Sequence, residues 1–423
     1  MGYNRPVPSA AMPIKPSFRH FTPAFCPLLG AAQAATTLLD HPAVEVAHQV
    51  YQEDAQAGLE GVRIESWYVK GSVEITEDTS FRFQMLQDAI SGASPTGATD
   101  TATGLPAFVP VTDMRQGILG ALSRKIDDHL VALEVSRSIE DDYLSYNFAL
   151  SDVWDLNQKN TTLTFGLSYT DDAVGDPEGS NQLLKKNYEV FSSISQIIDK
   201  NTIVSAGLTL GLNRGYLNDP RKVIERTEHD TVTETVPIYD DSDPPVQIGE
   251  NTVTRPISWL ATYPENRPDS RLRGVLQLNG THYFEAARGA LDLTYRLADD
   301  DFGVFSNMIQ CEWRQSIGPD WLVTPYVRYY RQSAADFFHP TLDGIPFDPN
   351  NQDGTPPNYS SDYRLSELSA FSVGMRVRYQ INERLGAFAA YERYAMSPES
   401  GVRAPTITYP SADVWTFGLS ASF

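Results

Sequence analysis

The sequence predicts an all-β protein, a transmembrane antiparallel up-and-down β-barrel of about sixteen strands with long acidic extracellular loops. Apolar and polar residues alternate with a period of two over many segments, as in strands that face lipid on one side and a wet lumen on the other. These segments are 12 to 17 residues long, and strands of soluble domains are usually shorter. Short and long connections also alternate, as they do between the two rims of an outer-membrane barrel.

Composition and charge exclude several other classes of protein. With 423 residues, 41% of them hydrophobic, the chain can bury a core and is not expected to be disordered. Its formal net charge of -21 would repel phosphates, so no nucleic-acid partner is expected. No apolar run reaches the roughly 20 residues of a membrane-spanning helix. Cys26 and Cys311 are too few for a disulfide framework or a Cys-ligated metal site.

The first 34 residues are predicted to be an export signal. Lys15 and Arg19 precede a modest apolar stretch, and Ala32-Gln33-Ala34 fits a cleavage site near Ala34. Residues 35 to 42 would then form a short periplasmic segment. Residues 43 to 423 would form the barrel, with an insertion at 216 to 269.

The end of the chain shows the alternation most clearly. Trp415, Phe417 and Leu419 share one parity, and Thr416 and Gly418 lie between them. The same pattern predicts strands near residues 43–54, 60–75, 77–89, 113–125, 128–139, 141–154, 159–171, 185–199, 201–215, 270–285, 287–299, 302–316, 320–334, 364–380, 383–397 and 410–423.

The connections between these strands place the two rims. Tight turns are expected at every second connection, and the long segments 90–112, 172–184, 216–269, 335–363 and 398–409 lie between them. The connections near residues 55–59, 140 and 300 are short exceptions to this alternation. Both ends of the barrel domain then fall at the rim with tight turns, so its first and last strands can pair and leave no open edge. The alternative is a soluble β-sandwich or propeller, but its strands would be shorter and its long polar loops would not all lie on one side.

The long insertion contains its own strand signals. Residues 231 to 239 and 246 to 255 are β-prone runs, and the turn cluster Asp240 to Pro245 separates them. Their many Thr, Glu and Asp side chains would be costly against lipid. The sequence therefore predicts a hairpin that extends beyond the membrane.

Five ordered motifs resemble those of a bacterial domain-of-unknown-function family of predicted outer-membrane barrels. They are Ser91 to Pro95 (SGASP), Asp113-Met114-Arg115 (DMR), Glu140 to Ser145 (EDDYLS), Tyr326 to Phe338 (YVRYYRQSAADFF) and Asp362 to Gly374 (DYRLSELSAFSVG). The resemblance covers about residue 43 to the end. It implies the barrel fold and the outer membrane of a Gram-negative-type bacterium, and it implies no activity. Genes of this family often lie beside thioredoxin-like and flavin-transferase genes, which implies a periplasmic redox partner.

The parity opposite to the apolar one should line the lumen with charge of both signs. The candidate lumen residues are Arg63, Glu65, Arg82, Asp88, Glu134, Asp292, Arg296, Glu312, Arg314, Arg328, Arg376, Arg378 and Glu392. One interpretation is that these side chains form ion pairs that stiffen the wall. The other is a selectivity constriction, for which Arg328, Arg376 and Arg378 are the best candidates because neighbouring strands bring them together.

The outward parity ends in aromatic residues that suit the membrane interface. These are Trp321, Tyr329, Tyr379, Tyr391, Trp415 and Phe423. The partners expected on this surface are outer-membrane lipid and lipopolysaccharide. Phe423, which ends an alternating aromatic strand, also resembles the terminal signal that barrel assembly machinery reads.

The long loops hold most of the negative charge. Segments 171–184, 216–269 and 335–362 together carry a net charge of -15. A solvated acidic rim is the simpler interpretation. The alternative is a divalent cation, with Asp348, Asn350 and Asp353 as oxygen donors, although their spacing misses the calcium-loop pattern by one residue. No other cofactor is expected.

Enzyme signals are weak. The motifs Gly-x-Ser-x-Gly, His-Glu-x-x-His and Gly-Lys-Ser are all missing, and His129, His282 and His339 lie in no nucleophile motif. The chain is therefore not expected to be an enzyme, and an outer-membrane hydrolase with a scattered triad is the less favoured alternative.

Two functions remain in view. The first is a pore or passive solute transporter whose mouth is restricted by segment 216–269 or 90–112, since sixteen strands leave room for an aqueous channel. The second is a barrel scaffold for a periplasmic or exported partner in an envelope redox pathway.

Overall fold

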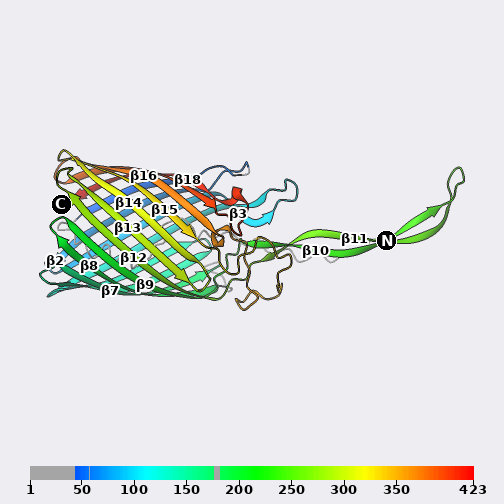
Figure 1. Ribbon diagram of the computed structural model, residues 1–423, viewed down its shortest axis with the longest axis horizontal. Coiled ribbons are helices and arrows are strands. Elements are labelled where there is room, and N and C mark those ends of the chain that lie inside the picture. Colours follow the sequence, from blue (N-terminus) through cyan, green and yellow to red (C-terminus); the bar gives the residue numbers. More distant parts are fainter. Residues whose placement is uncertain (1–42, 57, 176–181) are drawn as a thin grey trace.

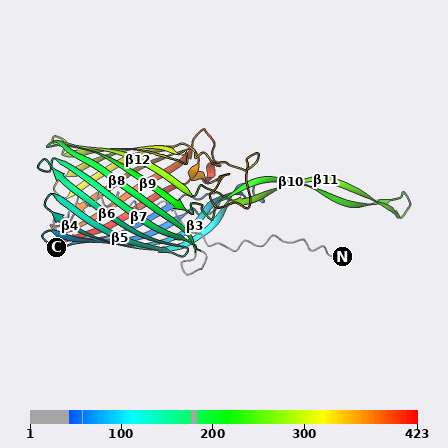
Figure 2. The ribbon, with the colours of Figure 1, turned by 90° about the horizontal axis from the view of Figure 1, so that it is seen from below.

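Sixteen strands form one closed antiparallel barrel, and two more form a hairpin that projects from one end (Figures 1 and 2). The computed structural model describes residues 43–56, 58–175 and 182–423. The predicted export signal, its cleavage site at Ala34 and residues 35 to 42 lie outside these described residues. Within the described part, no helix has the length and apolarity needed to cross a membrane.

All sixteen predicted strands are present, and the predicted barrel is confirmed. The strands of the wall are β1 (Ala43–Glu53), β2 (Arg63–Thr76), β3 (Thr79–Thr99), β4 (Pro106–Ile126), β5 (His129–Glu140), β6 (Tyr143–Leu156), β7 (Thr161–Val174), β8 (Leu183–Asp199), β9 (Thr202–Gly215), β12 (Ser270–Phe284), β13 (Gly289–Asp300), β14 (Phe305–Ile317), β15 (Trp321–Gln332), β16 (Leu368–Gln380), β17 (Leu385–Pro398) and β18 (Ser411–Ser422). Two 3₁₀ turns, η1 (Tyr363–Leu365) and η2 (Thr406–Thr408), lie in the connections before β16 and β18.

The barrel closes between its first and last strands. β1 pairs with β18 from Ala43 opposite Ser422 to Glu53 opposite Ala412. One rim, called the turn rim here, holds connections of two to four residues together with the C-terminus (Figure 1). The opposite end, called the loop rim, holds the longer connections, together with the short β5–β6 and β13–β14 turns. Because every strand has two neighbours, the wall has no exposed edge.

The two faces of the wall differ as the alternation predicts. On β18, Trp415, Phe417 and Leu419 are 46 to 63% exposed on the outer face. On the inner face, Thr324 and Ser372 are almost fully buried. The outer face is therefore an apolar surface of the kind that lipid covers.

Aromatic residues gather on the outer face, where the sequence predicts them. Near the turn rim, Trp321 packs against Tyr379 in a tilted arrangement with ring centroids 4.4 Å apart. On the side of the loop rim, Tyr391 packs against Trp415 in a tilted arrangement with ring centroids 4.3 Å apart, and the Tyr391 hydroxyl donates to Asp413. Such pairs are suited to the two interfaces of a bilayer, where a ring meets both hydrocarbon and water.

The segment 90–112, expected as a loop, is mostly strand. β3 and β4 continue to Thr99 and from Pro106, so that only residues 100 to 105 form the connection. Their pairing runs from Ser91 opposite Thr112 to Pro95 opposite Phe108. The expectation was wrong because Gly, Ser, Pro and Thr in this stretch hide the period-two pattern. The backbones of β3 and β4 still pair in this stretch, because it extends the hydrogen-bonded ladder that the two strands already form in the wall.

The insertion forms the predicted hairpin, which is longer than expected. β10 (Val223–Tyr239) pairs with β11 (Gln247–Pro264) over their whole length. β9 pairs directly with β12, so the hairpin contributes nothing to the wall. The hairpin points away from the barrel at the loop rim (Figure 2).

The lipid face can be tested with two substitutions in β9. Leu208→Arg places a charge on the outer face, where Leu208 is 45% exposed, and should destabilise the assembled barrel by about 2 to 4 kcal/mol. Ser205→Arg, on the inner face of the same strand, should assemble normally. The measurement is the fraction of heat-modifiable barrel on gels after refolding. Equal damage from both substitutions would contradict the assignment of faces.

The hairpin can be shortened to test its independence. Replacing residues 231 to 256 with Asn-Gly keeps the hairpin base and supplies a two-residue turn. The variant should keep its heat-modifiable barrel and its β circular dichroism, because no wall hydrogen bond passes through the removed part. Loss of the barrel would mean that these residues belong to the wall.

Candidate functional site: the polar lumen and its cap

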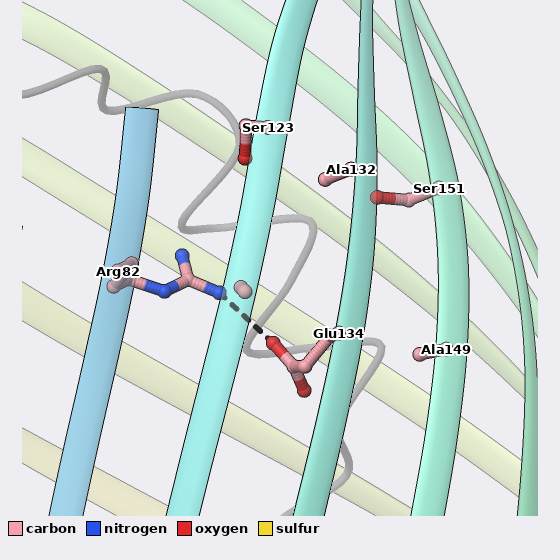
Figure 3. A pocket seen from close by; sticks show the side chains of 7 residues that line it. Arg82, Ser123, Ala132, Glu134, Ala149 and Ser151 are labelled. Atoms are coloured by element: carbon pink, nitrogen blue, oxygen red, sulfur yellow. Dashed lines mark hydrogen bonds and ion pairs between the residues drawn. The ribbon is translucent and has the colours of Figure 1, made fainter. Parts of the chain in front are cut away.

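One charged pair in the lumen bridges two strands across a third. Arg82 on β3 donates to Glu134 on β5 over 2.9 Å (Figure 3). Between them, Ala121 on β4 stands opposite both residues. Because its side chain is small, the guanidinium can pass over it. A small pocket lies around this pair, and Ser123 and Ser151 also line it.

A second group of charged residues lies on β13 to β17. Arg314 donates two hydrogen bonds of 2.5 Å to Asp292 on the neighbouring strand. The Tyr326 hydroxyl donates to Glu392 over 2.5 Å. To do so it crosses Gly374, where a Cβ atom would lie only 2.5 Å from the Tyr326 ring. A glycine is therefore required at this place for the tyrosine to reach its partner.

The three arginines proposed as a selectivity group share the inner face of β15 and β16 but differ in their partners. Arg328 donates to Gln310 over 2.8 Å and lies 3.7 Å from Glu392. Arg378 lies 3.8 Å from Glu45, across the two intervening strands β17 and β18. Arg376 has neither a hydrogen bond nor an ion pair with any residue of the described ranges. The group therefore keeps an excess of positive charge.

Most other predicted lumen residues also face inward and are paired. Arg115 donates to Asp88 over 2.7 Å, Arg296 to Gln277 over 2.7 Å, and Gln310 to Glu312 over 3.1 Å. These contacts match the interpretation of ion pairs and hydrogen bonds that stiffen the wall. A role in selectivity stays a prediction for each of them.

Arg63 and Glu65 do not face the lumen, so their prediction was wrong. They share the parity of Trp67, which is 55% exposed on the outer face, and Arg63 pairs with Glu65 over 2.6 Å. The inward residue between them is Ile64, which is 5% exposed. Near the loop rim the inner face of β2 is apolar, because Ile64 packs there in a buried apolar core. A prediction that assigns charged residues to the lumen and apolar residues to lipid therefore places Arg63 and Glu65 on the wrong face.

The loops at the loop rim form a folded layer, called the cap here. It consists of residues 333–367 and 399–410, together with the base of the hairpin. Its core is apolar and includes Phe337, Phe338, Tyr363, Leu365 and Tyr409, which pack with Phe302 from the β13–β14 turn. A second cluster of Ile224, Leu342 and Tyr359 joins the base of β10 to residues 333–367.

A buried polar network fixes the cap to the hairpin base. Arg267 lies 2.7 Å from both Glu265 and Asp362, and these two carboxylates are each 1% exposed. Arg364 pairs with Asp219 over 2.7 Å and also with Asp362. Such a network adds little net stability but penalises any other arrangement of these segments. It therefore specifies how the cap sits on the barrel.

The five motifs behind the family resemblance meet at the loop rim. The carbonyl of Pro95 in SGASP accepts a hydrogen bond from the Lys222 amine. Asp362 and Arg364 of the last motif belong to the polar network. Asp113 and Glu140, from the DMR and EDDYLS motifs, lie close together below it. No spacing in the sequence could have brought these distant segments together.

The predicted cation donors lie in turns of the cap. Asp348 accepts the backbone N–H of Asn350, and Asp353 accepts that of Thr355. Cation binding there stays a prediction. In the described part of the chain, one group of three acidic residues has oxygens close enough to share an ion, and it consists of Asp113, Glu140 and Asp142. The sequence pattern did not single out this group.

Histidine contacts bear on the hydrolase alternative. His129 lies 2.9 Å from Asp152, His282 contacts Thr202 and His229 contacts Ser258. In the described ranges, no histidine lies between a carboxylate and a hydroxyl group, as a triad requires. His339 is half-buried, and burial lowers its pKa. The absence of an enzymatic activity stays a prediction.

Comparison with known proteins identifies the family. A family model described as "Protein of unknown function (DUF3570)" matches residues 101–188 and 181–417. The matches cover most of the chain, which therefore belongs to this family, as the motifs predict. No curated protein matches the chain.

Solved structures of outer-membrane proteins resemble the barrel. The siderophore receptor PirA from Pseudomonas aeruginosa is 12% identical, with 90% of this chain and 61% of that chain covered and a TM-score of 0.43. The CymD monoaromatic hydrocarbon channel is 9% identical, with 94% and 92% covered and a TM-score of 0.42. CdiB from Acinetobacter baumannii is 7% identical, with 91% and 60% covered and a TM-score of 0.47. The chain thus spans about 61% of the receptor's length, and these likenesses concern the overall fold alone.

Glu53, at the loop end of β1, makes the stability of the folded protein depend on pH. Its carboxylate accepts hydrogen bonds from the Tyr51 hydroxyl over 2.9 Å and from the Val62 N–H over 3.1 Å. Burial is the main cause that raises the pKa of Glu53 to about 7. The folded protein therefore holds a proton that the unfolded chain releases, and stability falls as the pH rises from about 4.5 to about 7.

The substitution Glu53→Gln should remove this dependence. Between pH 4.5 and 7, the wild type should lose up to roughly 3 kcal/mol relative to the variant. Thermal unfolding at pH 5 and pH 8 measures the difference between the two proteins. Glu60→Gln, at an exposed position of the connection that follows β1, is the control and should behave as the wild type. If Glu53→Gln keeps the wild-type difference, Glu53 titrates normally.

Proposed function

We propose that this chain is an outer-membrane pore or passive solute channel. The observation that carries the proposal is the inner face of β15 and β16, where Arg376 faces the lumen and pairs with no other described residue. A charge held at the wall without a partner is costly unless water or a passing ion solvates it. A barrel of sixteen strands has room for that water.

The loop rim would face the outside of the cell and the turn rim the periplasm. Outer-membrane barrels carry their longer loops outside, and their short turns lie in the periplasm. Lipid and lipopolysaccharide would surround the apolar outer face. Phe423, which is 68% exposed at the turn rim, would be available to the assembly machinery.

The channel would be weakly selective for anions. Arg328, Arg376, Arg378 and Lys70 contribute four positive charges, against Glu45, Glu312 and Glu392 with three negative ones. Rings of arginine and lysine favour anions in pores. The cap would limit the size of solutes that reach this constriction, and the extension of β3 and β4 would support the cap from the side.

A scaffold for a partner is the second candidate, and the hairpin is the observation that favours it. An isolated two-stranded hairpin is only marginally stable in water, so a bound partner would stabilise it. The side chains of Ile248, Ile257 and Trp259 on β11 are 39 to 64% exposed, and a partner would cover them. An exported or periplasmic protein of an envelope redox pathway could bind either the hairpin or the turn rim.

Conductance of purified protein in planar lipid bilayers tests the pore. The wild type should give stepwise currents with a preference for Cl⁻ over K⁺ in a salt gradient. Arg376→Glu should lower that preference or reverse it, because the unpaired charge changes sign. Arg255→Glu, far out on the hairpin, makes the same change of charge and should leave selectivity unchanged.

Two results would count against this proposal. A silent wild-type barrel would exclude an open pore and favour the scaffold. Conductance with selectivity that is unchanged in Arg376→Glu would place Arg376 outside the path of the ions.

A further inference from the structure

Three buried carboxylates come together where β4, β5 and the β5–β6 turn meet at the loop rim. Asp113 lies on β4, Glu140 ends β5, and Asp142 lies in the two-residue turn that follows. One oxygen from each lies within 4.8 Å of the others. Their exposed fractions are 5, 6 and 7%, so water from outside does not screen them well.

Asp113 and Asp142 each leave one buried carboxylate oxygen without a hydrogen bond. Oδ1 of Asp113 accepts the N–H groups of Met114 and Asp141, but its Oδ2 is buried without a partner. The Asp142 carboxylate accepts no hydrogen bond from another residue of the described ranges, and its Oδ1 is buried. Leaving such groups unsatisfied costs free energy, and each one calls for an explanation such as an ion.

The nearby basic residue does not balance the three acids. Arg221, from the connection between β9 and β10, acts electrostatically on Asp113, Glu140 and Asp142. The same guanidinium also acts on Asp219, so it does not neutralise the three acids by itself. A cation held between the carboxylates would offset their mutual repulsion.

We propose that Asp113, Glu140 and Asp142 bind a Ca²⁺ ion at the loop rim. All three donors are oxygens, which Ca²⁺ prefers, and one oxygen of each residue lies within 4.8 Å of the others, close enough for a single ion to contact all three. Mg²⁺ requires shorter distances of about 2.1 Å and a stricter octahedral geometry. Backbone carbonyls and water would supply the remaining ligands. The ion would fasten the β5–β6 turn to β4, directly below the extension that supports the hairpin base.

Calorimetric titration of CaCl₂ into the purified full chain in detergent, after removal of metals with a chelator, tests the site. The wild type should bind one ion with a dissociation constant on the order of 0.1 to 1 mM, as extracellular calcium modules do. Asp142→Asn keeps the shape of the side chain and should weaken binding by about tenfold or more. Asp141→Asn is the matched control, since Asp141 is an exposed acid in the same turn, and its affinity should stay within about twofold.

Arg221→Gln provides a second readout that does not remove a ligand. Without the guanidinium, Ca²⁺ should bind several-fold more tightly, because the repulsion between two cations is gone. Heat-modifiable migration on gels confirms that each variant is folded before titration. No saturable binding by the wild type, equal binding by Asp141→Asn and Asp142→Asn, or an unchanged affinity in Arg221→Gln would each overturn the proposal.

Discussion

Inside lipid, every backbone N–H and C=O group must find its partner within the protein, because no water is present to replace one. A closed barrel meets this constraint for strands, and here the pairing of β1 with β18 completes it. The other features of the wall follow from that closure. Each strand has one face toward lipid and one toward the lumen, so apolar residues collect on one side and charges on the other.

The charges inside are consequently close to one another. Most meet a partner on a nearby strand, as Arg82 does with Glu134 across the small Ala121. Arg376 departs from this pattern, which is why the proposed pore depends on it. At the loop rim the wall ends, and the connections there are stabilised by packing among themselves. There the connections are long enough to build an apolar core of their own, and buried ion pairs fix their arrangement.

The sequence predicted the face on which a residue lies more accurately within the wall than near the loop rim. The candidate functional site has residues in both regions. Arg328, Arg376 and Arg378 were placed on one inner face correctly, since parity within a regular strand is strict. Arg63 and Glu65 were misplaced because the inner face near the rim is apolar, which inverts the pattern. Asp113, Glu140 and Asp142 stood in the quoted motifs, but their meeting depends on the register of β4 against β5.

The sequence by itself determined the class of fold, the number of strands in the wall and the two rims. These properties are local, because a period of two and the length of a connection can be read within a few residues of each position. Only the tertiary structure decided which loops form the cap, which charges are paired and which carboxylates share one buried place. Those properties depend on contacts between segments far apart in the chain, such as Arg267 with Asp362, and no local pattern records which segment will lie beside which.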